Sequence, residues 1–98
     1  MTIQRDPEGN ELKQLRQMVE ISGRRVLEIG SGDGRLTWKY AGLAREVVAL
    51  ELERDDLLIA RVECPVALRR QVVFIRGDSI HLPFRGAAFD VALLSWSL

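Results

Sequence analysis

Residues 26–34 read Val26-Leu27-Glu28-Ile29-Gly30-Ser31-Gly32-Asp33-Gly34, an apolar run followed by three glycines at alternate positions. The apolar run is typical of a buried strand, and the glycines favour a tight turn that leads into a helix. Glycine has no side chain that would keep a ligand away from the backbone. The stretch therefore predicts a strand, a turn and a helix that together cradle a nucleotide-like cofactor.

The spacing and the charges of this stretch indicate which cofactor. A dinucleotide fingerprint has the form G-x-G-x-x-G, but here the third glycine comes one residue early, at Gly34, and Arg35 stands in the later place. Glu28 and Asp33 put negative charge beside the turn. Such charge opposes a pyrophosphate and suits a ligand with ammonium and sulfonium groups. The pattern favours S-adenosyl-L-methionine over NAD.

From about residue 24 to residue 98 the chain resembles the class I S-adenosyl-L-methionine-dependent methyltransferases. Three blocks follow in the order of that family: the glycine motif, an acidic end to the apolar run 47–51, and Gly77-Asp78 after the run 72–76. A fourth block, residues 82–84 followed by residues 89–94, is similar to the type 11 methyltransferases, a group typified by enzymes of quinone biosynthesis. The resemblance implies a methyltransferase that acts on a small-molecule acceptor.

The alternation of apolar runs and helical patterns predicts an α/β fold with a doubly wound parallel sheet. By resemblance this sheet is Rossmann-like, has the strand order 3-2-1-4 and is truncated after its fourth strand. Residues 1–98 are then one partial cofactor-binding domain, with a capping helix over about 8–22. Further helices are predicted after Gly34 and over residues 54–63, where Pro65 ends the pattern.

The resemblance assigns roles to the first motif. The backbone N–H groups of Gly30, Gly32 and Gly34 approach the methionine end of the cofactor, and Glu28 meets its ammonium group directly or through water. Ser31 in the same turn is included among the cofactor-binding residues. A turn that needs glycine for its conformation alone is the alternative interpretation.

Glu51 ends the second apolar run and lies at the spacing, about 20 residues, at which such folds place a carboxylate for the ribose hydroxyls. A carboxylate can accept from both hydroxyls at once. Glu53 is the competing candidate. Leu52 is expected to pack on the adenine face, with a place in the core as its alternative.

Three further residues complete the predicted site. By resemblance, Asp78 accepts from the adenine amino group and the backbone N–H of Ser79 meets a ring nitrogen. The alternative role of Asp78 is an N-cap. Ser95, after the fourth strand, is also included among the cofactor-binding residues. We name no catalytic residue, since the activated sulfonium requires mainly proximity and alignment from the protein.

Composition limits the other function classes. The 98 residues carry 14 basic and 14 acidic side chains and are 47% hydrophobic, which is typical of an ordinary globular core and gives no indication of a nucleic-acid partner. The start of the chain is too polar for a signal peptide, and no apolar run reaches the roughly 18 residues that cross a bilayer. We therefore expect a cytoplasmic protein without membrane contact. Cys64 is the single cysteine and lacks neighbours for a metal site, so no metal is expected.

The end of the chain raises a further expectation. Full-length relatives continue with a helix and about three more strands, which carry most of the substrate contacts. If the fourth strand ends the sheet, its outer edge is unpaired and invites self-association or a partner chain, with Ser95 and Ser97 facing outward. The chain alone is then expected to be inactive.

Two other functions remain open at this point. The chain could be an inactive cofactor-binding module that docks on a partner. Residues 26–51 also resemble the ribosomal RNA adenine dimethylases, but those enzymes hold the target amino group with an Asn- or Asp-Pro-Pro/Leu-Tyr type motif. Residues 95–98 read Ser-Trp-Ser-Leu at that place, and this departure argues against base methylation.

Overall fold

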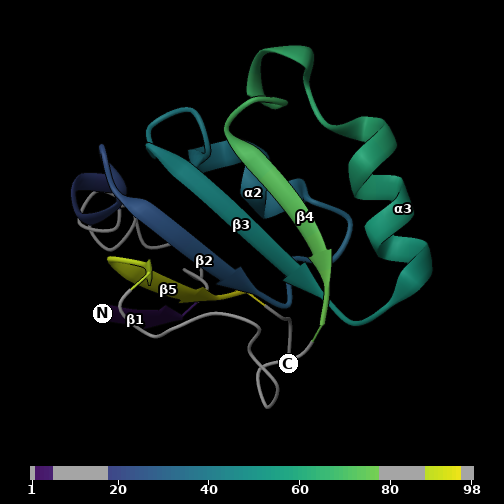
Figure 1. Ribbon diagram of the computed structural model, residues 1–98, viewed down its shortest axis with the longest axis horizontal. Coiled ribbons are helices and arrows are strands. Elements are labelled where there is room, and N and C mark those ends of the chain that lie inside the picture. The colour runs from purple at the N-terminus through teal and green to yellow at the C-terminus, as the bar shows by residue number, and fades with distance from the viewer. Residues whose placement is uncertain (1, 6–17, 78–87, 96–98) are drawn as a thin grey trace.

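The computed structural model describes residues 2–5, 18–77 and 88–95. Within these ranges five parallel strands form one sheet in the order β1-β5-β2-β3-β4 (Figure 1). The strands are β1 (Thr2–Arg5), β2 (Arg25–Ile29), β3 (Glu46–Glu51), β4 (Val72–Arg76) and β5 (Val91–Leu94). The helices are α2 (Arg35–Tyr40) and α3 (Arg54–Glu63), with a 3₁₀ turn η1 (Val66–Leu68); residues 18–21 are also helical.

The predicted order and direction of the four central strands are confirmed. Numbered as in the sequence analysis, the strands β2, β3, β4 and β5 are the first to fourth predicted strands, and they lie in the predicted order 3-2-1-4. All of them are parallel, with Ile29 opposite Leu50 on one side and opposite Leu94 on the other. Helix α3 has the predicted bounds and precedes Pro65. Parallel strands place their carboxyl ends at one edge of the sheet, and this edge carries the site.

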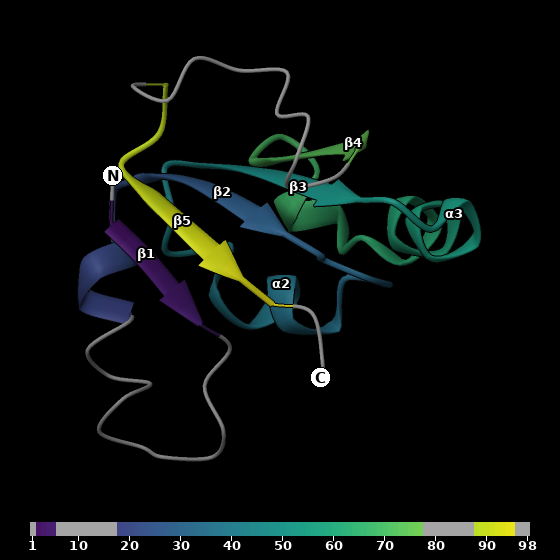
Figure 2. The same ribbon diagram turned by 90° about the horizontal axis from the view of Figure 1, so that it is seen from below.

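The expectation that the last strand lies at the edge of the sheet is wrong. β1 pairs with β5 in parallel, from Thr2 opposite Val91 to Arg5 opposite Leu94. The two strands lie side by side in both views (Figures 1 and 2). The fourth predicted strand is therefore paired on both sides, because it also pairs with β2. Its backbone groups have partners, and the physical reason for association through β5 disappears.

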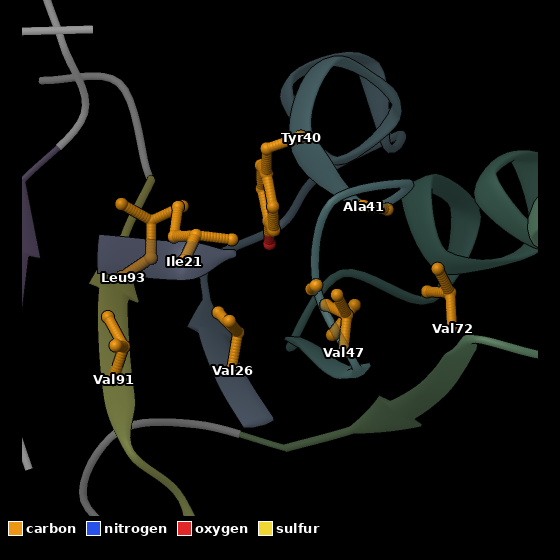
Figure 3. Close-up of a cluster of buried hydrophobic side chains, with 10 residues drawn as sticks. Ile21, Val26, Tyr40, Ala41, Val47, Val72, Val91 and Leu93 are labelled. Carbon is orange, nitrogen blue, oxygen red and sulfur yellow. The ribbon is translucent and has the colours of Figure 1, made fainter. Parts of the chain in front are cut away.

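The buried apolar side chains form one cluster on each face of the sheet. Helix α2 lies against one face (Figure 2), where Tyr40 and Ala41 pack with Ile21 and with strand residues such as Val26 and Leu93 (Figure 3). The second cluster consists of Leu27, Ile29, Val48, Leu50 and Phe89. Because side chains alternate along a strand, odd and even positions of β2 supply the two clusters. This packing fixes β2 between two apolar layers and holds the turn that follows it.

Several predictions fall outside the described residues. These are the part of the capping helix before residue 18, the cofactor contacts of Asp78 and Ser79, the block 82–84 and the motif position at 96–98. Among the residues that the structure describes, no helix has both the length and the apolar character that a bilayer crossing requires.

Candidate cofactor site

The candidate site lies where four strands end at the same edge of the sheet. The turn 30–34 follows β2, Glu51 closes β3, Gly77 follows β4 and Ser95 follows β5. The chain passes from β2 to β3 on one side, whereas β5 lies on the other side of β2. This reversal is the topological switch point at which open α/β sheets bind their ligands. The structure thus brings the predicted glycines, Glu51 and Ser95 to one edge.

The glycine turn has the backbone conformation that the sequence predicts. Gly30, Gly32 and Gly34 all have positive φ, at 76°, 60° and 94°. The N–H groups of Gly30 and Ser31 donate to the carbonyl of Leu50 at 2.8 and 3.1 Å, so the turn is attached to the end of β3. The Ser31 side chain is buried against the same carbonyl. The turn is therefore a fixed part of the sheet edge.

Glu51 connects the end of β3 to the middle of this turn. Its Oε1 accepts from the N–H of Gly32 at 2.6 Å, and its Oε2 accepts from the N–H of Glu53 at 2.8 Å. Both donors are backbone N–H groups, and neither forms an ion pair with the carboxylate. The side chain of Leu52 is 53% exposed, and a core position for it is excluded. The Glu53 side chain is exposed as well.

Asp33 contributes less charge to the site than the sequence pattern suggests. Its Oδ1 lies 3.1 Å from Nε of Arg35, in an exposed ion pair. The Arg35 guanidinium neutralises the Asp33 carboxylate locally, and an exposed pair of this kind is worth little to stability. The electrostatic preference for a cationic ligand therefore depends on Glu51 more than on Asp33.

The Glu28 side chain points into the protein, and its hydrogen-bond partners there were not predicted from the sequence. It is fully buried on the face of β2 that α2 covers. Its Oε1 accepts hydrogen bonds from the hydroxyls of Thr37 at 2.6 Å and Tyr40 at 2.5 Å, and its Oε2 accepts one from Ser95 at 2.6 Å. We call these four side chains the Glu28 hub. The predicted contact between Glu28 and the cofactor ammonium stays a prediction; the hub gives Glu28 a visible structural role.

Ser95 occupies a different position from the outward one expected. Its hydroxyl contacts Glu28 and also lies 3.0 Å from the carbonyl oxygen of Gly30. Its backbone N–H donates to the carbonyl of Ile29 at 3.0 Å. Ser95 therefore ties the end of β5 to the start of the glycine turn. Its predicted contact with the cofactor remains a prediction.

Thr37 and Tyr40 are the residues of this region whose hydrogen bonds sequence reasoning missed. Tyr40 packs in the cluster on the α2 face, and its hydroxyl also donates to Glu28. Thr37 is fully buried. The signal available in the sequence was its place three residues before Tyr40, on the same helix face, where a hydroxyl needs a partner. Trp38 lies over Gly34 and meets the Phe74 ring edge-on at a centroid distance of 5.7 Å.

The hub predicts an unusual alkaline titration. Burial, the charge of Glu28 and the hydrogen bond to Glu28 raise the pKa of Tyr40 well above its usual value of 10.0. Since the folded pKa exceeds the unfolded one, the stabilisation from Tyr40 is complete below pH ~10 and is lost as the pH rises through the folded pKa. Tyr40 is the single tyrosine, so tyrosinate absorbance reports it alone. We expect that absorbance to appear together with alkaline unfolding; ionisation of the folded protein at the ordinary pKa would contradict the hub.

Comparison with known proteins gives the family. Residues 26–98 match the family model of a methyltransferase domain. The demethylmenaquinone methyltransferase of Renibacterium salmoninarum is 32% identical over 78 residues, which cover 80% of this chain and 31% of that protein. The ribosomal RNA small subunit methyltransferase A of Geobacter sulfurreducens is 41% identical over 64 residues, which cover 65% of this chain and 22% of that protein.

A solved structure agrees with these relatives. An S-adenosylmethionine-dependent methyltransferase from Mesorhizobium loti is 29% identical with a TM-score of 0.67, over 88% of this chain and 40% of that one. The chain thus spans about a third of the length of the curated relatives that it matches. Because residues 26–98 match the family model and the glycine turn lies at the switch point of the sheet, the chain belongs to the S-adenosyl-L-methionine-dependent methyltransferases.

Proposed function

We propose that this chain is the S-adenosyl-L-methionine-binding part of a methyltransferase that transfers the methyl group to a small-molecule acceptor. The observation that carries the proposal is the joint placement of the positive-φ glycine turn and the Glu51 carboxylate at the switch point of the sheet. The turn leaves its backbone open to a ligand, and Glu51 supplies acceptors for hydroxyl groups.

The residues present fit this cofactor. The Glu51 carboxylate uses one acceptor site on each oxygen for a backbone N–H, and a carboxylate offers about four such sites. Two acceptor sites therefore remain for two vicinal ribose hydroxyls. Leu52 next to it presents exposed apolar surface on which a purine ring can lie. The negative charge of Glu51 disfavours a ligand rich in phosphate.

The chemistry assigned to this chain is binding and orientation. The bound cofactor supplies an activated methyl group on a sulfonium. Glu51 holds the ribose, and the glycine turn holds the amino-acid end. Together they fix the direction in which the methyl group is presented, and alignment of this kind lowers the barrier of a transfer reaction.

The choice of acceptor follows from the relatives. Demethylmenaquinone methyltransferases of four bacteria are 25–32% identical to the chain over 76–89 residues. A demethylated quinol is therefore the first acceptor to test. Adenine in ribosomal RNA is the second, on the 41% identity to the Geobacter sulfurreducens relative. The even charge of the chain favours the small molecule. The cytoplasmic location stays a prediction.

Calorimetry tests the cofactor assignment. We expect S-adenosyl-L-methionine and S-adenosylhomocysteine to bind the chain at least about tenfold more tightly than NAD, because Glu51 disfavours the pyrophosphate. Equal or tighter binding of NAD would refute the assignment. Transfer of labelled methyl to a short-chain quinol or to ribosomal RNA separates the two acceptors. Cofactor binding without transfer to either, together with a stable stoichiometric complex with a partner chain, would support the inactive module instead.

A further inference from the structure

We infer that Glu51 is a positioning residue: it holds the glycine turn in its binding conformation before the cofactor arrives. The inference rests on the proposed function but concerns a contact that the protein makes within itself. Gly32 and Glu51 are 19 residues apart, and the 2.6 Å bond between them joins the middle of the turn to the end of β3. We call the bonds from Gly32 and Glu53 to this carboxylate the Glu51 clasp.

Gly32 depends on the clasp more than its neighbours do. Gly30 and Ser31 are held by the carbonyl of Leu50, and Gly34 donates to the carbonyl of Ser31. At Gly32, by contrast, an added Cβ would meet no atom within 4 Å in the part of the chain that the structure describes. Its φ of 60° lies in a region from which a glycine leaves easily. Packing does not restrain this point of the turn, so the bond to Glu51 does.

Both oxygens of the Glu51 carboxylate are held by backbone N–H groups. Oε2 accepts from the backbone N–H of Glu53, which is the N-cap residue of α3. The carboxylate is therefore held in one orientation. Glu51 is 8% exposed, and a charge-assisted bond that is shielded from water in this way is among the stronger hydrogen bonds. Since the free acceptor sites of the same carboxylate are those proposed for ribose, one side chain connects the ribose subsite with the glycine turn.

A ligand without ribose hydroxyls distinguishes a positioning role of Glu51 from a simple contact with ribose. If Glu51 only bound ribose, its replacement would leave unchanged the affinity for a ligand that lacks the ribose hydroxyls. If Glu51 positions the turn, the replacement weakens that ligand too, because the amino-acid end of the ligand meets a turn that is no longer held. The relevant ligand is 2′,3′-dideoxy-S-adenosylhomocysteine.

The first experiment measures the clasp in the ligand-free chain. Hydrogen exchange of the Gly32 amide, followed by nuclear magnetic resonance, is expected to become about ten- to a hundredfold faster in Glu51→Gln, which loses a charged acceptor. The matched control is Glu53→Gln, where only the backbone joins the clasp; its Gly32 exchange should stay within about twofold of wild type. Equal Gly32 exchange in wild type and Glu51→Gln would overturn the inference.

Folding of the variant is checked in the same spectra, because the amides of the sheet report it directly. Glu51→Asp is the second variant: it keeps the charge, but its shorter side chain cannot span both donors. We expect Gly32 exchange in Glu51→Asp to lie between wild type and Glu51→Gln. If Glu51→Gln fails to fold, faster Gly32 exchange in folded Glu51→Asp supports the clasp, and wild-type exchange there overturns it.

The second experiment uses binding. Glu51→Gln is expected to weaken the dideoxy ligand about fivefold or more, and S-adenosylhomocysteine by more than that, since ribose contacts are lost as well. An unchanged affinity for the dideoxy ligand, with weakened S-adenosylhomocysteine, would refute positioning and keep the proposed function. If wild type bound no S-adenosylhomocysteine, the proposed function would fail. Gly32 exchange in the ligand-free chain would still report whether the clasp forms.

Discussion

Glu28→Ala is expected to lower the free energy of unfolding by about 4 kcal/mol. The substitution removes the acceptor of three hydroxyl groups in the Glu28 hub and leaves space between β2 and α2. Thr37 and Tyr40 lose their acceptor, at about 1–3 kcal/mol each, whereas the Ser95 hydroxyl can still donate to the carbonyl of Gly30. The lost volume adds a cavity term. A domain of this size has only about 5–15 kcal/mol of stability, so the variant should approach the unfolding threshold. Urea denaturation at neutral pH measures the difference.

Glu28→Gln is the matched control, and the geometry predicts that it is mild. A glutamine carbonyl can still accept from Thr37 and Tyr40. Its amide can donate to the Ser95 hydroxyl, which then donates to the carbonyl of Gly30 at 3.0 Å. Every hydroxyl keeps a partner in this arrangement, so the cost should stay near 1 kcal/mol. If alanine cost no more than glutamine, the hub would not hold α2 and β5 on β2.

The strands at the centre of the fold were readable because they bury continuous apolar runs. β2 and β3 are almost wholly buried, as parallel strands covered on both faces should be. Helix α3 has three acidic residues, Glu53, Asp55 and Asp56, at its start, and Pro65 follows its end. These signals lie within the elements themselves, and they fix the order of elements from which the topology follows.

β1 was missed because its signal is not local. It has four residues, too few for a period-2 pattern to stand out, and its partner β5 lies at the other end of the chain.

Helix α2 is also shorter than its apolar pattern, which continues to Leu43 and Ala44. It ends at Tyr40, two residues before Gly42, and Leu43 is 45% exposed. The chain leaves the helix there to start β3.

The candidate site, like the fold, was predictable from the sequence only in part. Glycine conformations and the place of Glu51 follow from sequence spacing, since a strand end and a turn determine them. The hydrogen-bond partners of Glu28 do not follow from the spacing, because they lie on α2 and after β5 and depend on how these elements pack on β2. Alternation along β2 does put Glu28 on the face of Val26, toward α2. The sequence analysis placed Glu28 at the cofactor and not on this face, and only the packed structure supplies the hydroxyls that its carboxylate accepts from.

The second large effect is expected at Gly34, which begins α2. Its φ is 94°, and a Cβ there would come closer than 3.0 Å to three atoms of the Trp38 ring. Gly34→Ala therefore combines two costs: about 1–2 kcal/mol for a side chain in the left-handed region, and about 1–3 kcal/mol for displacing a packed ring. We expect a loss of about 3 kcal/mol in the free energy of unfolding, together with loss of the edge contact between Trp38 and Phe74.

Two other glycines separate these costs. Gly23 has a φ of 70° but open space around an added Cβ, so Gly23→Ala should show the backbone cost alone, about 1–2 kcal/mol. Gly42 is outside the positive-φ set, and its nearest atom lies at an ordinary 3.8 Å, so Gly42→Ala should stay within about 0.5 kcal/mol of wild type. In the Gly34→Ala background, Trp38→Leu should recover the steric part and leave the backbone part. Denaturation curves of the four variants decide the matter: if Gly34→Ala cost no more than Gly23→Ala, the Trp38 ring would not rest on the turn, and the close packing described for the start of α2 would be wrong.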